Sequence, residues 1–194
     1  MLKIYYSFFE NPQILPVACL QRNEEINGCK NLKTKTQKYA VWKLLEYAIF
    51  DSFGKTAEET VFSKSKNGKW TSNICHFSLS HSENAIAVAI SNSPVGIDVE
   101  RIRTLPSGIE NKILSPSEIE EFSTTPILEK NAYLIRKWTE KESYFKSLDK
   151  KNRSIINDNT LDKTFTHHLI NNNGEQYFIS VFATANEQAT IIKV

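Results

Sequence analysis

The chain has 194 residues, of which 40% are hydrophobic and 24% charged, and this ordinary balance excludes an intrinsically disordered chain. Lysine and arginine together exceed aspartate and glutamate by only two, 24 against 22, so the net charge does not predict nucleic-acid binding. The longest apolar run, residues 85–90, is far shorter than the roughly 20 residues that a membrane span requires. We therefore expect neither nucleic acid nor a membrane among its partners.

The N-terminal residues and the cysteines both predict a reducing compartment. Residues 1–10 have neither the continuous apolar stretch nor the small-residue cleavage site of a signal peptide. The three cysteines, at positions 19, 29 and 75, show no C-x-x-C spacing, so we expect neither a disulfide framework nor a zinc site. These observations predict a cytoplasmic protein.

The first half of the chain predicts a strand, then a helix, then a series of short strands. Aromatic and branched residues at 2–9 are typical of a strand. Apolar residues recur at three- and four-residue steps over 35–50, which indicates a helix that Gly54 ends. Asn67-Gly68 is a dipeptide favoured in tight hairpin turns. We expect strands beside it and beyond it, separated by turns at 81–84 and 91–94, at residues 60–63, 69–71, 76–80, 85–91 and 95–101.

The second half predicts a similar set of elements. Ser115-Pro116 and Thr125-Pro126 are each typical of a helix start, and they predict a short helix and a longer one over about 127–148. Strands are expected at 164–170, 176–183 and 189–193, with a turn at 171–174. We therefore predict an α+β fold in which two similar α+β halves, 1–94 and 95–194, pack together within one chain.

Two acidic residues lie two positions apart in the expected strand 95–101. The period of a strand places Asp98 and Glu100 on one face, with Ile97 and Val99 on the other. Two carboxylates this close repel each other by about 1 kcal/mol or more, and a Mg²⁺ ion between them would remove that cost. The alternative, which spacing alone favours, is a solvated strand face on which Glu100 pairs with a neighbouring arginine.

The long helix carries a second candidate group. Trp138, Glu142 and Lys146 lie four residues apart and therefore share one face. On spacing alone, we interpret them as an exposed Glu–Lys pair beside a core tryptophan, an interaction worth about a few tenths of a kcal/mol.

Groups that commonly donate to phosphates occur at two further places. Lys69 follows the Asn67-Gly68 turn, and Ser80-His81 lies at the end of an expected strand. Taken singly, Lys69 would be a solvated turn residue and His81 a capping or surface residue. The lysines that lead into the first helix, the last of which is Lys38, would form a solvated face or bind an anion.

Taken in order, three segments resemble the 4′-phosphopantetheinyl transferases. Residues 77–82 (FSLSHS), 95–100 (VGIDVE) and 137–146 (KWTEKESYFK) contain every residue type of the family pattern, (V/I)-G-(V/I)-D and then (F/W)-(S/C/T)-x-K-E-(A/S)-x-x-K. The intervening segment, residues 99–137, has 39 residues. Because Asp98 lies at mid-chain, the chain looks like the surfactin-synthetase-activating type, which is an intramolecular pseudo-dimer and a monomer.

The resemblance implies transfer of the phosphopantetheine arm of coenzyme A to a serine of an apo acyl or peptidyl carrier protein, with release of 3′,5′-ADP. It implies that Asp98, Glu100 and Glu142 hold Mg²⁺, or Mn²⁺ in its place. Glu142, or a water that it orients, would accept the serine proton, and Lys146 would contact the phosphate that leaves with ADP.

The same resemblance implies how the other substrates are bound. The residues expected to bind coenzyme A are Lys38, Lys69, Ser80, His81 and Lys146. Glu118 resembles a further acidic position of the family. The segment 150–177 would face the carrier protein, and its basic residues could meet an acidic carrier helix or simply be solvated: Lys150, Lys151, Arg153 and Lys163.

Two other functions remain open at this point. A non-catalytic carrier-binding protein of the same fold would have no use for the metal-site residues Asp98, Glu100 and Glu142. A nucleic-acid-binding protein would explain the N-terminal lysines alone, and the near-neutral net charge argues against it.

Overall fold

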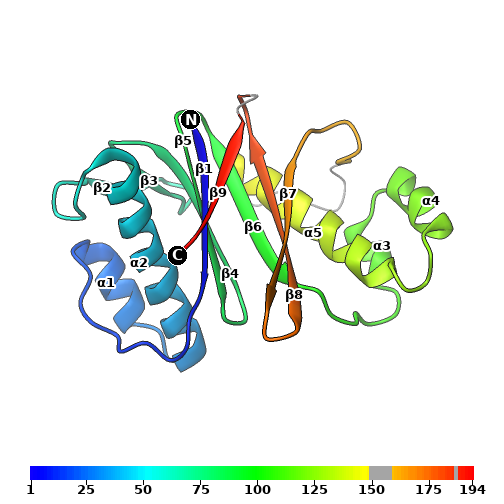
Figure 1. Ribbon diagram of the computed structural model, residues 1–194, viewed down its shortest axis with the longest axis horizontal. Coiled ribbons are helices and arrows are strands. Elements are labelled where there is room, and N and C mark those ends of the chain that lie inside the picture. The colour runs from blue at the N-terminus through cyan, green and yellow to red at the C-terminus, as the bar shows by residue number, and fades with distance from the viewer. Residues whose placement is uncertain (149–158, 186–187) are drawn as a thin grey trace.

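The computed structural model describes residues 1–148, 159–185 and 188–194, and the predicted α+β class is confirmed. Two sheets meet near the middle of the molecule, with helices on the outer side of each (Figure 1). In chain order the elements are β1 (Leu2–Phe8), α1 (Leu20–Asn27), α2 (Leu32–Phe53), β2 (Phe62–Lys64), β3 (Trp70–Ser72), β4 (His76–Ser82), β5 (Ala85–Ser91), β6 (Val95–Arg101), α3 (Glu110–Ile113), α4 (Pro116–Thr124), α5 (Lys130–Ser147), β7 (Thr166–Asn172), β8 (Glu175–Ala183) and β9 (Ala189–Lys193).

The larger sheet has four strands in the order β4-β5-β1-β9. Strand β1 is antiparallel to β5 and parallel to β9, which comes from the far end of the chain. The final strand of the second half therefore completes the sheet of the first half. The division into halves at residue 94 stays a prediction. Strand β9 lies in the second half of the sequence but pairs with β1 of the first half.

Strand β5 is buried on both faces because its sequence alternates small and large apolar residues. Its larger residues, at 86, 88 and 90, pack with Trp42 of α2 in one core. Its three alanines lie in a second core with Ile97 of β6 and Ile179 of β8. The small side chains on this face allow the second sheet to approach closely.

The second sheet has three antiparallel strands in the order β6-β8-β7, and β2 and β3 form a separate two-stranded hairpin. Helix α5 packs against β6 and β8 on the side away from the larger sheet (Figure 1). Strand β6 also lies against β4, at the boundary between the two sheets. This boundary brings β4, β6 and α5 together.

The predicted turn residues are confirmed in part. Gly68 adopts a φ of +87° between β2 and β3, which a glycine at a hairpin turn readily allows. The turn predicted over 81–84 is present but shorter, because His81 and Ser82 still pair with β5 and the chain reverses at Glu83-Asn84. A two-residue turn suffices there because Glu83 adopts a φ of +52°.

The helix predictions need three changes. Helix α2 begins earlier than expected, at Leu32, because the Asn31 side chain accepts a hydrogen bond from the backbone N–H of Thr34. Helix α5 begins at Lys130 rather than near 127, and Ile127 and Leu128 are highly exposed before it. Helices α1 and α3 were not predicted, since segments of eight and four residues show little periodicity.

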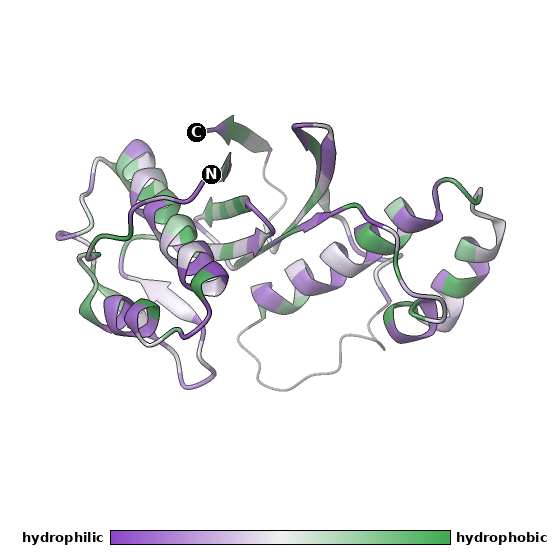
Figure 2. Ribbon diagram, turned by 90° about the horizontal axis from the view of Figure 1, so that it is seen from below, coloured by the Kyte–Doolittle hydropathy of each residue, from purple (hydrophilic) through white to green (hydrophobic). Residues whose placement is uncertain are grey.

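The helices carry hydrophilic and hydrophobic residues side by side (Figure 2). Within the described residues, none of them is both long enough and apolar enough to cross a membrane. Their apolar residues instead pack against the sheets, as in the cluster around Trp42 and Leu45.

Candidate active site

Strand β6 presents its two acidic residues away from the core between the sheets. Ile97 and Val99 are fully buried in that core, whereas Asp98 and Glu100 accept hydrogen bonds from serines of β4. The predicted common face is confirmed. The ion pair of the solvated-face interpretation is also present, because Arg103 Nη1 lies 3.2 Å from Glu100 Oε2.

Asp98 joins three elements at one point. Its Oδ1 accepts hydrogen bonds from Lys146 Nζ of α5 at 2.6 Å and from Ser80 Oγ of β4 at 2.7 Å. Lys146 Nζ is also 3.2 Å from Ser80 Oγ. Three predicted site residues, 18 and 48 positions apart along the chain, therefore lie in direct contact.

Gly96 makes this contact possible. A Cβ atom at position 96 would lie 1.8 Å from the carbonyl oxygen of Ser143 in α5, far inside any allowed distance. The glycine of the V-G-I-D segment is therefore required for close packing of a helix on a strand rather than for an unusual backbone angle. This packing sets the distance between α5 and Asp98.

Glu142 lies in a partly buried, negatively charged environment. Burial raises the pKa of its carboxyl group, Lys146 lowers it, and the charges of Asp98 and Glu100 raise it further. The net pKa is above the usual value for glutamate. Burial and Asp98 likewise raise the pKa of Glu100, although the hydrogen bond from Ser82 opposes this. The three carboxylates thus interact with one another.

The donor set is compatible with a hard divalent cation. Oδ2 of Asp98 is buried and has no hydrogen-bond partner among the described residues, which is costly unless a ligand engages it. Carboxylate oxygens are the ligands that Mg²⁺ prefers, and a cation would also reduce the repulsion among Asp98, Glu100 and Glu142. Within residues 1–148, 159–185 and 188–194, no group of three or more acidic, histidine or cysteine side chains is already placed so that it could hold a metal ion.

Lys69, in the β2–β3 hairpin, contacts helix α5. Its Nζ donates to the carbonyl oxygens of Lys146, at 2.6 Å, and Ser147, at 3.4 Å. A cavity of about 270 Å³ lies between this hairpin, β4 and the end of α5, and Lys69 and Lys146 both line it. Two cationic side chains at one cavity could receive an anionic ligand.

His81 lies near two cations. Burial lowers the pKa of its imidazole to about 4, and the charges of Lys146 and Arg22 act in the same direction. Lys38 is on α2, where its carbonyl oxygen accepts a hydrogen bond from Arg22 at 2.8 Å. The roles of His81 and Lys38 in phosphate binding remain predictions.

Arg22 was missed as a candidate from the sequence. It is the first arginine of the chain and the only one before position 101, which was the available signal. The residue is 6% exposed, its guanidinium lies over the ring of Trp42, and its Nε has no hydrogen-bond partner in the described part of the chain. Ser82 was also missed, because nothing in the local sequence distinguishes it from other serines.

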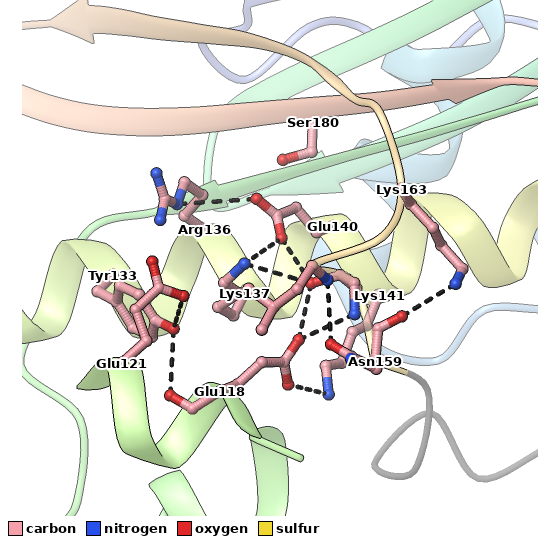
Figure 3. A network of polar contacts seen from close by, with 12 residues as sticks. Glu118, Glu121, Tyr133, Arg136, Lys137, Glu140, Lys141, Asn159, Lys163 and Ser180 are labelled. Atoms are coloured by element: carbon pink, nitrogen blue, oxygen red, sulfur yellow. Dashed lines mark hydrogen bonds and ion pairs between the residues drawn. The ribbon is translucent and has the colours of Figure 1, made fainter. Parts of the chain in front are cut away.

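Glu118 belongs to a separate polar network that joins α4 to α5 (Figure 3). Its fully buried carboxylate is paired with Lys141 Nζ at 2.7 Å and accepts the backbone N–H groups of Ser115 and Thr160. Although burial raises the pKa of Glu118, Lys141 and these hydrogen bonds hold it at about 2. Both oxygens are occupied by protein groups, which indicates a structural role.

The expected carrier-facing segment is only partly described. Lys150, Lys151 and Arg153 lie outside the described residues. Lys163 lies within them and donates to the carbonyl oxygen of Asn159 and to the carboxylate of Asp162.

Comparison with known proteins gives a consistent result. A family model described as the 4′-phosphopantetheinyl transferase superfamily matches residues 94–192. The chain is 29% identical over 106 residues to 4′-phosphopantetheinyl transferase psf-1 of Bacillus pumilus, a match that covers 53% of this chain and 46% of that protein. It is 30% identical over 126 residues to 4′-phosphopantetheinyl transferase gsp of Aneurinibacillus migulanus, covering 64% and 53%. The matches thus span about half the length of these relatives.

Proposed function

Because the chain belongs to the 4′-phosphopantetheinyl transferase superfamily, we propose that it transfers the 4′-phosphopantetheine arm of coenzyme A to a serine of an apo acyl or peptidyl carrier protein. The observation that carries this proposal is the convergence of Asp98, Lys146 and Glu142 from β6 and α5. These residues come from the two parts of the sequence pattern that resembles the family. We further propose that the protein acts as a cytoplasmic monomer.

Asp98, Glu100 and Glu142 would hold one divalent cation, Mg²⁺ or Mn²⁺, and the unpartnered Oδ2 of Asp98 supports this assignment. Such an ion, when bound, neutralises charge on the pyrophosphate of coenzyme A. The lysine that already contacts Asp98 then has a second function, since Lys146 would contact the phosphate whose negative charge grows as 3′,5′-ADP leaves.

Glu142 would act as the general base. The carrier serine Oγ forms a bond to the β-phosphorus while the bond to the oxygen of 3′,5′-ADP breaks, and the serine proton goes to the Glu142 carboxylate. In the chain without a bound cation, burial and the neighbouring carboxylates raise the pKa of this carboxyl group, which favours uptake of a proton. Correct placement of the serine contributes as much as basicity in a reaction of this kind.

We assign coenzyme A to the side of the site where the cations gather. Lys69 and Lys146 line one cavity, and Ser80 contacts Lys146 directly. His81 and Lys38 would contact the remaining phosphates. Arg22, close enough to lower the pKa of His81, is a further candidate on this side.

Intact-mass spectrometry tests the proposal directly. An apo carrier protein is incubated with the chain, coenzyme A and Mg²⁺, with EDTA in a parallel reaction. We expect a mass increase of one phosphopantetheine that EDTA prevents. No increase on acyl or peptidyl carriers, from folded protein that binds both coenzyme A and the carrier, would contradict the proposal and favour a non-catalytic carrier-binding protein.

A further inference from the structure

Three serines alternate along β4 and face β6. Ser78, Ser80 and Ser82 are 6%, 5% and 8% exposed, so their hydroxyl groups depend on protein partners. Each hydroxyl oxygen accepts a hydrogen bond from a backbone N–H of β6, at 3.1 to 3.3 Å, and the donors are Ile97, Val99 and Arg101. Strand β6 lies at the edge of its sheet, so no neighbouring strand accepts hydrogen bonds from these three N–H groups. The serine side chains of β4 accept them instead.

Two of these serines have a second contact. Ser80 Oγ donates to Asp98 Oδ1 at 2.7 Å, and Ser82 Oγ donates to Glu100 Oε2 at 2.7 Å. Ser78 stands at the equivalent position opposite Gly96, which has no side chain to receive its hydrogen. Of the three serines, Ser80 and Ser82 therefore also bind a proposed metal ligand, whereas Ser78, which lines the cavity beside Lys69 and Lys146, binds none.

We propose that Ser82 is a positioning residue for the divalent-cation site and acts through Glu100, an inference that rests on the proposed function. The N–H of Arg101 fixes the Ser82 oxygen, so the Ser82 hydrogen points at one oxygen of the Glu100 carboxylate. Arg103 donates to the same oxygen, Oε2. In the described part of the chain these contacts hold Glu100 by Oε2 and leave Oε1 for a ligand.

Outer hydrogen bonds of this kind orient metal ligands, and their loss commonly weakens metal binding by about 10- to 100-fold. Ser80 has the same geometry toward Asp98, but it is also an expected coenzyme A residue and contacts Lys146. Ser82 gives the cleaner test, because its two hydrogen bonds go to β6 and to the Glu100 carboxylate.

The test compares Ser82→Ala with Ser78→Ala. Both variants leave a backbone N–H of β6 without its serine partner, so both are expected to lower the unfolding temperature. Binding of Mn²⁺ is measured by electron paramagnetic resonance in the absence of coenzyme A, because Ser78 also lines the cavity assigned to coenzyme A. We expect Ser82→Ala to weaken Mn²⁺ binding by about tenfold or more, whereas Ser78→Ala stays within twofold of the unmodified chain.

Wild-type Mn²⁺ affinity in Ser82→Ala, or equal losses in both variants, would overturn the inference. Should Ser82→Ala fail to fold, Ser82→Cys replaces it, because a thiol fills the same space but is a weak hydrogen-bond donor. An unchanged Mn²⁺ affinity in Ser82→Cys would also overturn the inference. The transfer assay tests the proposed reaction independently of the Mn²⁺ measurement. A chain that binds Mn²⁺ in a Ser82-dependent way but transfers nothing supports the positioning role and contradicts the proposed reaction.

Discussion

Glu142 differs from the surface glutamates in its environment rather than in its chemistry. Burial and the charges of Asp98 and Glu100 raise the pKa of its carboxyl group. Stability alone would not favour a buried carboxylate oxygen without a partner, Oδ2 of Asp98, close to two further carboxylates whose charges oppose its own. The loss of stability that these buried and mutually repelling carboxylates cause is consistent with a functional site.

Substitution of Glu142 by glutamine tests its proposed role. Glu142→Gln keeps the size of the side chain, removes the base, and relieves repulsion with Asp98 and Glu100. We expect transfer to fall by about 10²- to 10⁴-fold, while the unfolding temperature stays the same or rises. The exposed Glu120→Gln on α4 is the matched control, and full transfer activity in Glu142→Gln would refute the assignment.

Glu118 makes a pH prediction at the same scale. Its pKa of about 2 in the folded chain lies below the unfolded value of about 4.5. A lowered pKa means that the carboxylate stabilises the folded state above about pH 4.5, and that this contribution disappears as the pH falls toward 2. A difference of this size corresponds to roughly 3 kcal/mol.

Urea unfolding of the wild-type chain and Glu118→Gln at pH 7 and pH 3 measures this contribution. At pH 7 we expect the variant to be less stable by about 3 to 5 kcal/mol, because Lys141 keeps a buried charge without its partner. The difference should shrink at pH 3. An equal difference at both pH values would show that titration of Glu118 does not contribute.

At the scale of elements, the close packing of α5 on β6 determines the site. The helix supplies Glu142 and Lys146, and the strand supplies Asp98, so any displacement separates the acidic and basic groups. Gly96 is the point of closest approach between the two elements.

Replacement of Gly96 by alanine should therefore affect both stability and activity. The added Cβ would meet backbone atoms of α5, which cannot move aside as a flexible side chain can. We expect a loss of about 3 kcal/mol or more in the free energy of unfolding, and loss of transfer in any folded fraction. Gly28→Ala is the milder comparison, since the added Cβ would lie 3.3 Å from the carbonyl oxygen of Glu24, a tight contact but not an overlap, and the backbone angles are ordinary. A wild-type unfolding midpoint in Gly96→Ala would contradict this packing.

Elements with strong local signals could be predicted from the sequence. The Asn67-Gly68 turn and the Gly54 helix end depend on residues that tolerate positive φ, and both are confirmed. The extension of β4 through His81 and Ser82 could not be predicted, because turn-forming residues there are held in the strand by pairing with β5.

The residues of the candidate active site could be predicted from the sequence only in part. Strand period alone placed Asp98 and Glu100 on one face, and the resemblance to a family grouped them with Glu142 and Lys146. No local signal connects Ser82 to Glu100 or Thr160 to Glu118, because these contacts depend on how distant elements pack.

At the scale of the whole molecule, the four-stranded and the three-stranded sheet each depend on residues from both halves of the chain. Strand β9 pairs with β1, so the larger sheet needs both ends of the chain. Strand β6 depends on serines of β4 for three of its backbone N–H groups. Leu2 and Ile4 of β1 lie in the same apolar core as Ile97 and Ile179.

These shared contacts predict that the chain unfolds as one cooperative unit. A fragment of residues 1–94 would lack β9 and expose the alanine face of β5, and a fragment of residues 95–194 would leave the β6 edge without its serine partners. We expect differential scanning calorimetry of the full chain to give one transition with equal calorimetric and van't Hoff enthalpies. We expect neither fragment alone to show a cooperative transition. Two separate transitions, or a fragment that melts like the intact protein, would mean that the halves fold independently and that the contacts between the sheets contribute little to stability.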